Sequence, residues 1–412
     1  MAIVQPFQAF RYSQRAGDPA TLLTQPYDKI SPAMQQRYLA ASPHNLVRVI
    51  LGESLLGDNE SQNVYTRAAA YFEAWMRDGI LTQDSQPGFY AYFQEFDVPD
   101  TGERLTRQGF IGLGKVEDYS SGVVFRHEET LTGPKKDRME VLRHTHAHFG
   151  QVFMLYPDPS GDVDREVFSA AATDPVTDVL DEYGARHRLW PITDPVRISR
   201  IQALMAPMKL LIADGHHRYE TALNYRNDHP GDPAPQFVMM TFINMYSQGV
   251  KILATHRVLD GIAHFSDQLL RDRCALPWTL RELPDASSLK RALASGANNQ
   301  VRIGAVTADR LFLLERPRQP DELDVPVLHH EIIEGWLGIS GDAVREEKHI
   351  DFVRGADIAI AKVREHGAQV AFLLNPTPMD DMARVAFSGG VMPQKSTDFY
   401  PKLLTGMTIY HL

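Results

Sequence analysis

The chain contains one cysteine, Cys274, among its 412 residues. A single thiol cannot close an internal disulfide, and its being alone excludes a metal site built from several cysteines. Cys274 lies in the charged stretch RDRCAL, so we interpret it as a bystander rather than a nucleophile. We therefore look for chemistry in other side chains.

Long apolar runs are also missing. None approaches the ~20 residues that a helix needs to cross a bilayer, so we expect no membrane partner. The opening segment MAIVQPFQAFRYSQ has no charged region followed by an apolar stretch, as a signal peptide would have. These features predict a cytoplasmic protein.

The sequence has no long block of lysine and arginine, and its formal net charge is −10. Nonspecific binding to nucleic acid depends on a basic surface that displaces counterions from phosphates. The acidic balance therefore disfavours a nucleic-acid partner, although a local basic groove stays open. A small anionic ligand needs only a few well-placed cations, so the charge does not count against one.

The pattern of elements predicts an α/β (α+β) fold with a mixed sheet core. There is no internal repeat and no low-complexity tract. We expect an N-terminal α/β region over 1–97, a central region over 98–250 that holds the main site, and a C-terminal α/β region over 251–412. The expected elements include helices from Ser31, over 64–78, around 327–337 and over 351–365, and a β-hairpin from Phe89 to about residue 119.

The clearest pattern lies in the central region. ISRIQALMA predicts a helix, KLLIADG a buried strand and turn, HHRYETALNYR a second helix, and QFVMMTFIN a second strand. Strand, helix and strand in succession predict a crossover unit within the sheet.

The turn between that first strand and its helix favours an anion. Gly215 permits close backbone approach, and the free N–H groups of the first helical turn, together with the helix dipole, attract negative charge. His216, His217 and Arg218 follow at once and supply charge or donors. The alternative is that Asp214 merely caps the helix and both histidines are ordinary surface groups, but three such donors in a row favour function.

The string DGHHRYETA resembles the signature of the domain of unknown function 1015 family of bacteria and archaea. PYDKISP, HEETLTGPKKDRMEVLR, ILATHRVL and MPQKSTDFYPKLLTGM resemble other parts of that family, so the likeness runs along nearly the whole chain. Because the role of the family is poorly defined, the resemblance implies a fold more than a function.

A more distant likeness implies a chemistry. DGHHRYETA is similar to the Gly-Cys-His-Arg-Tyr-Glu segment of sulfiredoxins and to the Gly-Glu-Arg-Arg box of ParB proteins, a group that includes nucleotide hydrolases and free-serine kinases. The resemblance implies that His217 and Arg218 contact a nucleotide phosphate. His216 stands where sulfiredoxins carry their cysteine nucleophile, so reduction of sulfinic acids by that route is not expected.

A second polar group surrounds the turn Thr132-Gly133-Pro134. His127 and Glu128 precede it, and Lys135, Asp137 and Arg138 follow it. Phosphoryl transfer needs cations to neutralise phosphate oxygens and a carboxylate to take a proton or to hold Mg²⁺. The alternative is a solvated loop of mixed charge. The family resemblance favours function, above all for Glu128, Lys135, Asp137 and Arg138.

Three further groups are weaker. His144 and His148 would share one face of a helix, which suits a metal, although a helix face beside a polar site explains them as well. Asn244 and His256 follow or end strands, where open α/β sheets bind ligands or where polar groups simply cap a loop. Lys395 and Ser396 could reach an anion as a cation and a hydroxyl, but the Walker spacing is absent and a flexible loop is the alternative.

Together these patterns favour a nucleotide-dependent phosphotransferase that acts on a small hydroxy or amino acid. Gly215, His217, Arg218, Lys135 and Arg138 would hold phosphate. Glu128, Asp214 and His216 are the candidate catalytic groups; the expected cofactors are ATP or ADP and Mg²⁺, with Mg²⁺ bound through Asp214 or Glu128. The alternatives are a nucleotide hydrolase or switch of ParB-like logic without a small acceptor, and a ParB-like DNA-binding protein, whose basic groove and helix-turn-helix are not visible in the sequence.

Overall fold

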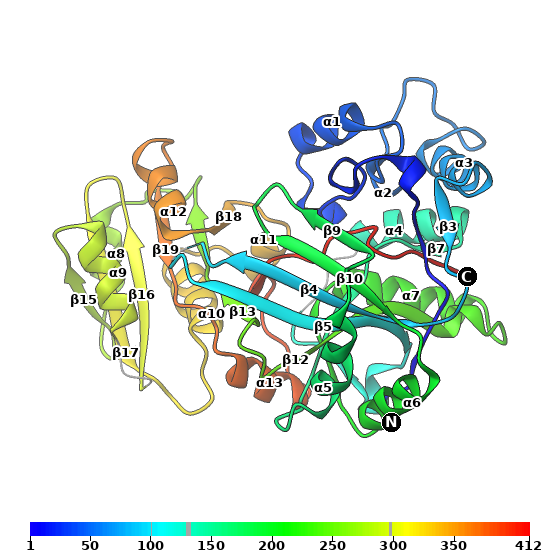
Figure 1. The fold of residues 1–412 in the computed structure, drawn as a ribbon. Coiled ribbons are helices and arrows are strands. Elements are labelled where there is room, and N and C mark those ends of the chain that lie inside the picture. The colour runs from blue at the N-terminus through cyan, green and yellow to red at the C-terminus, as the bar shows by residue number, and fades with distance from the viewer. Residues whose placement is uncertain (100, 129–132, 296–298) are drawn as a thin grey trace. The chain divides into compact units, whose positions relative to one another are not determined.

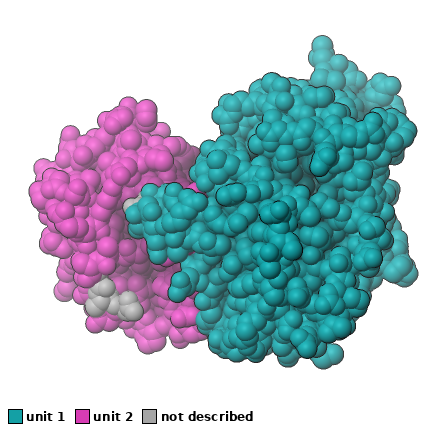
Figure 2. All heavy atoms as spheres, in the orientation of Figure 1, with its two compact units in different colours: residues 1–126, 130–250, 401–412 teal, residues 127–129, 251–400 magenta. Residues whose placement is uncertain are grey.

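The computed structural model describes residues 1–99, 101–128, 133–295 and 299–412, with only the backbone of residues 133–135. The chain forms two compact units (Figure 2). Unit 1 comprises Met1–Arg126, Thr130–Val250 and Pro401–Leu412, and unit 2 comprises His127–Glu129 and Lys251–Tyr400. The boundary expected at 250/251 coincides with a boundary between the two units. The predicted limit at 97/98 falls inside unit 1, because the strands on either side of it pair with each other.

Unit 1 is built on a mixed nine-stranded sheet (Figure 1). Its strands run in the order β6 (Val124–Phe125), β11 (Leu210–Asp214), β8 (Val152–Tyr156), β12 (Phe237–Asn244), β5 (Arg104–Lys115), β4 (Phe89–Asp97), β10 (Arg186–Ile192) and β9 (Thr177–Leu180), and β1 (Val4–Gln5) pairs with β5. The antiparallel pair β4–β5 confirms the predicted hairpin. The core of unit 1 lies on this sheet, where Phe89, Phe110 and Phe242 of neighbouring strands are all buried.

The crossover predicted between β11 and β12 is wrong. β8 lies between them, antiparallel to β11 and parallel to β12, so β11 and β12 are not neighbours and run in opposite directions. β8 is entirely buried and precedes both strands in the chain. Its pairing with them is therefore a contact between segments far apart in the sequence. Strand-helix-strand succession alone could not reveal it.

Helices pack on this sheet and beside it. The helices of unit 1 are α1 (Pro32–Ala41), α2 (Val47–Ile50), α3 (Val64–Arg77), α4 (Gly133–Thr145), α5 (Asp162–Phe168), α6 (Pro195–Met205) and α7 (His216–Asp228), with short turns η1 (Gln14–Ala16), η2 (Pro19–Thr21), η3 (Tyr27–Lys29), η4 (Tyr119–Ser121), η5 (Ser169–Ala172) and η6 (Ala234–Gln236). Ser31 caps α1 as predicted, since its side chain accepts from the N–H of Met34. Ile201 and Tyr219 bring α6 and α7 into the core of the sheet.

A second apolar cluster joins the N-terminal helices to the C-terminal tail. Phe72 of α3, Val141 of α4 and Phe149 pack with Ile409. The remaining pairs of unit 1 are β2 (Phe10–Tyr12) with β3 (Leu81–Gln83) and β7 (Ala147–His148) with β21 (Tyr410–His411). The C-terminal tail, Pro401–Leu412, therefore belongs to unit 1 although it follows unit 2 in the sequence.

Unit 2 holds a six-stranded sheet. Its order is β15 (Thr279–Glu282), β17 (Leu311–Pro317), β16 (Gln300–Val306), β19 (Val370–Leu373), β14 (Thr255–Leu259) and β18 (Ile350–Arg354), and β13 (Lys251–Leu253) pairs separately with β20 (Asp398–Tyr400). The helices are α8 (Asp267–Arg273), α9 (Ala286–Ala294), α10 (Asp324–Val327), the π-helix η7 (Leu328–Trp336), α11 (Gly341–Arg345), α12 (Ala356–Arg364) and α13 (Met379–Phe387).

The helix predicted over 351–365 is too long at its start. Residues Ile350–Arg354 form β18 and pair with β14, and the helix α12 begins only after Gly355, whose φ of +86° breaks the continuity. Among the described helices of both units, none combines the length and apolarity of a membrane span.

Candidate functional site

A left-handed glycine turns the chain from β11 into α7. Gly215 has φ +90° and ψ 28°, a conformation that disfavours a side chain, and no described side chain caps the helix that follows. A Cβ at this position would lie 2.8 Å from Nε of Arg218, because that side chain folds back over the glycine. The turn thus leaves the N-terminus of a 13-residue helix beside a guanidinium group.

Asp214 does not cap the helix, contrary to the simpler interpretation of the sequence. Its Oδ2 accepts from Nη2 of Arg218 at 2.7 Å, and its Oδ1 accepts from Nζ of Lys402 at 2.9 Å. Burial alone would raise the pKa of Asp214, but the charges of Lys402, Arg218 and Lys29 hold it well below its usual range. The carboxylate stays ionised and is a weak base.

Several cations act on Asp214. Lys402, Arg218 and Lys29 all act on it, and the fully buried Arg107 feels its charge as well. Burial lowers the pKa of Arg107 to about 10, while the charges of Tyr92 and Asp214 oppose that decrease. Cations gathered at a helix N-terminus form an arrangement that attracts anions.

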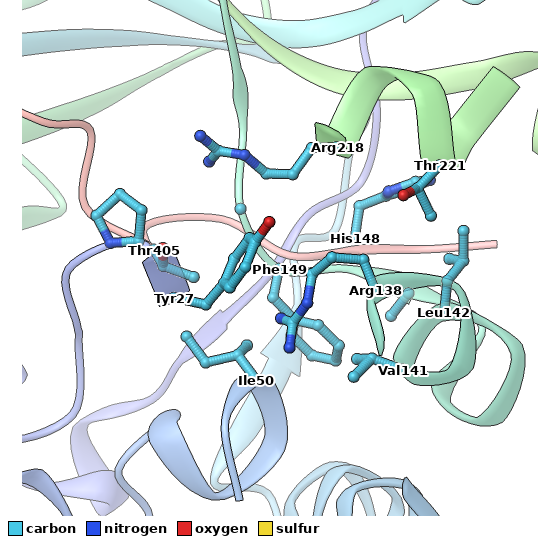
Figure 3. A pocket seen from close by; sticks show the side chains of 13 residues that line it. Tyr27, Ile50, Arg138, Val141, Leu142, His148, Phe149, Arg218, Thr221 and Thr405 are labelled. Carbon is cyan, nitrogen blue, oxygen red and sulfur yellow. The ribbon is translucent and has the colours of Figure 1, made fainter. Parts of the chain in front are cut away.

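Tyr27 lies beside this group, between two guanidinium groups (Figure 3). The guanidinium carbon of Arg138 lies 4.0 Å from the centre of the Tyr27 ring, and Nε of Arg138 donates to Asp137 at 2.9 Å. Burial, reinforced by Asp28, raises the pKa of Tyr27 to about 12 against the charges of Arg138 and Arg218. The hydroxyl of Tyr27 therefore stays protonated and can donate.

A small cavity adjoins Tyr27, and we call it the Tyr27 pocket. Its volume is about 70 Å³. It is lined by Pro26, Tyr27, Ile50, Arg138, Val141, Leu142, Ala147, His148, Phe149, Gly150, Arg218, Thr221 and Thr405. Arg218 therefore belongs both to the turn at Gly215 and to the wall of this pocket.

Four of the sequence motifs meet in unit 1. PYDKISP supplies Tyr27 and Lys29, the motif before α4 supplies Asp137 and Arg138, DGHHRYETA supplies the turn, and the C-terminal tail supplies Lys402. Sequence reasoning assigned no role to Tyr27, Lys29 or Lys402. The repeated occurrence of all four motifs in one resemblance was the signal that could have joined them.

The other residues predicted at this site lie close by. His216 is the first residue of α7 and is buried, whereas His217 is partly exposed and its carbonyl accepts from the hydroxyl of Thr221. Lys135 lies in α4, where the structure describes its backbone and not its side chain.

A second polar group lies in unit 2. The backbone N–H of Met392 donates to the carbonyl of His127 at 2.7 Å, and Glu128 accepts from the backbone N–H of Lys395. The ring of His127 lies 2.7 Å from the hydroxyl of Thr397, and Arg257 donates to the carbonyl of Lys395 at 3.1 Å. These contacts bind residues 127–128 to the loop 392–397.

Within that loop, Ser396 donates to the carbonyl of Pro393 at 2.5 Å. Glu128, His127, Lys395 and Ser396 thus lie together in unit 2, whereas Asp214 and Arg218 lie in unit 1. Several of these contacts join a side chain to a backbone group, as in a structural loop anchor.

Asn244 and His256 lie in different sheets. Asn244 ends β12 in unit 1, and its Nδ2 donates to the carbonyl of Asp158 at 2.7 Å and to Asp164 at 3.0 Å. His256 lies on β14 in unit 2, where Nδ1 accepts from the N–H of Leu374 and burial lowers its pKa to about 4. Each of the two side chains makes a hydrogen bond to a backbone group of a nearby segment.

The expectation that His144 and His148 share one face of a helix is wrong. α4 ends at Thr145, His146 has φ +48°, and His148 lies in β7, so the two imidazoles do not share a helix face. Across the described residues there is no group of three or more His, Cys, Asp or Glu side chains placed to hold a metal.

Solved structures show loose similarity to this chain. A conserved hypothetical protein from Pyrococcus furiosus matches at 13% identity and a TM-score of 0.36, over 69% of this chain and 92% of its own. A free serine kinase in complex with AMP matches at 12% identity and a TM-score of 0.34, over 69% of this chain and 89% of its own. SbnI with a C-terminal truncation from Staphylococcus aureus matches at 11% identity and a TM-score of 0.37, over 72% of this chain and 87% of its own. Likeness at this level does not extend to activity.

No curated protein matches the sequence. The family model described as "Protein of unknown function (DUF1015)" matches residues 4–329, which is most of the chain and contains Tyr27, Arg138 and Arg218. The match confirms the resemblance seen in the motifs. This protein belongs to the DUF1015 family.

Proposed function

We propose that this protein is a nucleotide-dependent phosphotransferase that acts on a small hydroxy or amino acid, with the nucleotide phosphates bound at the turn 214–218. One observation carries the proposal: Lys402, Arg218 and Lys29 gather around Asp214 at the uncapped start of α7. Phosphate is the common biological anion that such a combination of helix N-terminus, guanidinium and ammonium groups holds.

In this proposal the cations bind the phosphate and the carboxylate positions the cations. Arg218 offers a planar fork for phosphate oxygens, and Lys402 adds a compact positive charge. Asp214 holds both of them through ion pairs of 2.7 and 2.9 Å, so its proposed role is to position cations. The depressed pKa of Asp214 makes it a poor general base, which argues against the catalytic role suggested by the sequence.

The reaction needs little covalent help from the protein. The bond between the terminal phosphorus and its bridging oxygen breaks, a bond forms between that phosphorus and the acceptor oxygen, and the acceptor releases a proton. The leaving nucleotide keeps the bonding electrons as a phosphate anion. Catalysis then rests on positioning and on cations that neutralise the developing charge, which Arg218 and Lys402 would provide.

Mg²⁺ does not fit Asp214 in this arrangement. Both carboxylate oxygens already accept from Arg218 and Lys402, and those cations would repel a further positive ion. Asp214 therefore has no metal-binding role in the proposed reaction.

The decisive assay offers the protein a donor and a choice of acceptors. We expect incubation with Mg²⁺, ATP or ADP and a mixture of hydroxy and amino acids to yield a phosphorylated acceptor that mass spectrometry detects. The Arg218→Gln variant should make far less product. The matched control is Arg143→Gln, whose side chain lies on α4 and pairs with Glu140 and Asp228 instead.

The negative outcomes separate the alternatives. Tight nucleotide binding without any modified acceptor would remove the phosphotransferase and favour a hydrolase or switch. An absence of nucleotide binding would show that the turn 214–218 has been misassigned.

A further inference from the structure

The Tyr27 pocket has a definite size. At ~15 Å³ for each water-sized group, a cavity of about 70 Å³ has room for roughly five such groups. Sites for whole drug-sized or nucleotide ligands are several times larger, at about 300–1,000 Å³. The pocket therefore suits a compact molecule, and a nucleotide base and ribose would have to lie elsewhere.

Two arginine side chains, Arg138 and Arg218, line the pocket. The side chain of Arg138 is only 9% exposed, and its Nε and Nη2 face Asp137. Among the described residues its Nη1 makes no hydrogen bond. Arg218, 13% exposed, lines the opposite part of the wall. Each guanidinium group has a carboxylate partner, Asp137 for Arg138 and Asp214 for Arg218, and Nη1 of Arg138 is the donor that can bind an anionic group of a ligand.

The rest of the wall is mostly apolar. Ile50, Val141, Leu142 and Phe149 are all buried, and they give the cavity a closed hydrophobic side (Figure 3). Hydroxyl groups of Tyr27, Thr221 and Thr405 add a few polar contacts. A ligand with one anionic end, a hydroxyl or amine and a very short carbon body satisfies all three parts of the wall.

We infer that the Tyr27 pocket is the acceptor subsite, and that it takes a short hydroxy or amino monocarboxylate whose carboxylate pairs with Arg138. Arg218 joins this pocket to the turn at Gly215, so it lies between the bound acid and the phosphate. This inference rests on the proposed function for the role of the acid as acceptor. The binding of the acid by itself does not depend on that function.

The test is a calorimetric titration of the full-length protein with three probes. Lactate has the expected size and charge, propylene glycol replaces its carboxylate with an alcohol, and mandelate replaces its methyl group with a phenyl ring. We expect lactate to bind, with propylene glycol at least about tenfold weaker because it lacks the charged hydrogen bonds. Mandelate should not bind, because the cavity cannot hold its ring.

Variants identify the residues. The sequence suggested that Arg138 holds phosphate, whereas this inference assigns it to the acid. Arg138→Gln should therefore weaken the binding of lactate about ten- to a hundredfold, the range for a charge-assisted hydrogen bond, and leave ADP affinity within about twofold. Arg143→Gln, on the same helix but paired outside the pocket, should change neither. Leu142→Ala enlarges the apolar side, so mandelate should gain affinity relative to lactate, which tests the site even if Arg138→Gln does not fold.

Three results would overturn the inference: no lactate binding at millimolar concentration, equal lactate affinity in the wild type and in Arg138→Gln, or equal affinity for lactate and mandelate in the wild type. ADP titration in parallel keeps the two proposals apart. If ADP binds and lactate does not, the subsite is wrong and the phosphate site stands. If lactate binds through Arg138 and ADP does not bind, the subsite stands and the proposed function falls.

Discussion

At the scale of residues, the candidate site is centred on Asp214 and the cations around it. Sequence spacing was enough to place Arg218 near Asp214, because they are four positions apart on one turn. Lys402 could not be found this way, since 188 positions separate it from Asp214 and only the folded tail brings them together. The same holds for Lys29 and Tyr27, which reach the site from the first 30 residues.

Replacing Asp214 tests its role as a holder of cations. Asp214→Asn should lower the free energy of unfolding at neutral pH by about 3 kcal/mol, the low end for breaking a buried ion pair, because the side chain is 22% exposed. The pKa of Asp214 is depressed in the folded state, so its stabilisation is present above the unfolded pKa of ~3.9 and is lost as pH falls further.

The difference between wild type and variant should therefore shrink between neutral pH and about pH 3, as measured by urea unfolding. Asp97→Asn is the control, because its pair with Arg104 is largely exposed and worth little. A difference that stays constant with pH would refute the ion-pair account.

At the scale of elements, local pattern was a good guide and pairing was not. β11 and α7 begin and end within about two residues of the predicted segments, because buried apolar runs, Asp-Gly and the following helix formers are local signals. The neighbours of β11 were missed, since β8 pairs with it from a distant segment. The strand β18 was missed because its five residues precede a helix whose periodicity dominated the pattern.

The glycine at the start of α7 permits a matched experiment. Gly215→Ala places a Cβ at φ +90° and 2.8 Å from Arg218, whereas Gly231→Ala meets the same strain at φ +91° with nothing within 4 Å. Each should cost about 1–2 kcal/mol in backbone strain. Only Gly215→Ala should also displace Arg218 and weaken the binding of ADP, followed by calorimetry. Equal ADP affinity in the two variants would contradict the proposed position of the phosphate.

At the scale of the whole molecule, the chain leaves unit 1 after Val250 and returns to it at Pro401. The returning tail pairs with the N-terminal segment at Phe10–Ile409 and Thr24–Thr405, and Figure 1 shows it running through unit 1. The sequence predicted one C-terminal region over 251–412. Twelve residues of tail carry no periodicity that would assign them to another unit, so tertiary pairing alone decides their place.

Removal of this tail should affect both the fold and the site. A chain that ends at Tyr400 loses β21, the buried Ile409 and the ion pair of Lys402, so unit 1 should unfold at a lower temperature and ADP binding should disappear. Lys402→Met in the full-length chain separates the two effects, since it should weaken ADP binding while keeping the tail in place. Calorimetric scans and titrations measure both. A truncated protein with wild-type stability would show that the tail is not part of the unit.

The central claim is that the turn 214–218 holds a nucleotide phosphate, and the most direct measurement is the affinity for ADP of three proteins: the wild type, Arg218→Gln and Arg226→Gln. Arg226 lies on the same helix, but it contacts the carbonyl of Val116 and Asp118. The account predicts that Arg218→Gln loses about 1.5–3 kcal/mol of binding free energy and that Arg226→Gln keeps the wild-type affinity. Equal affinity in the wild type and in Arg218→Gln would contradict it.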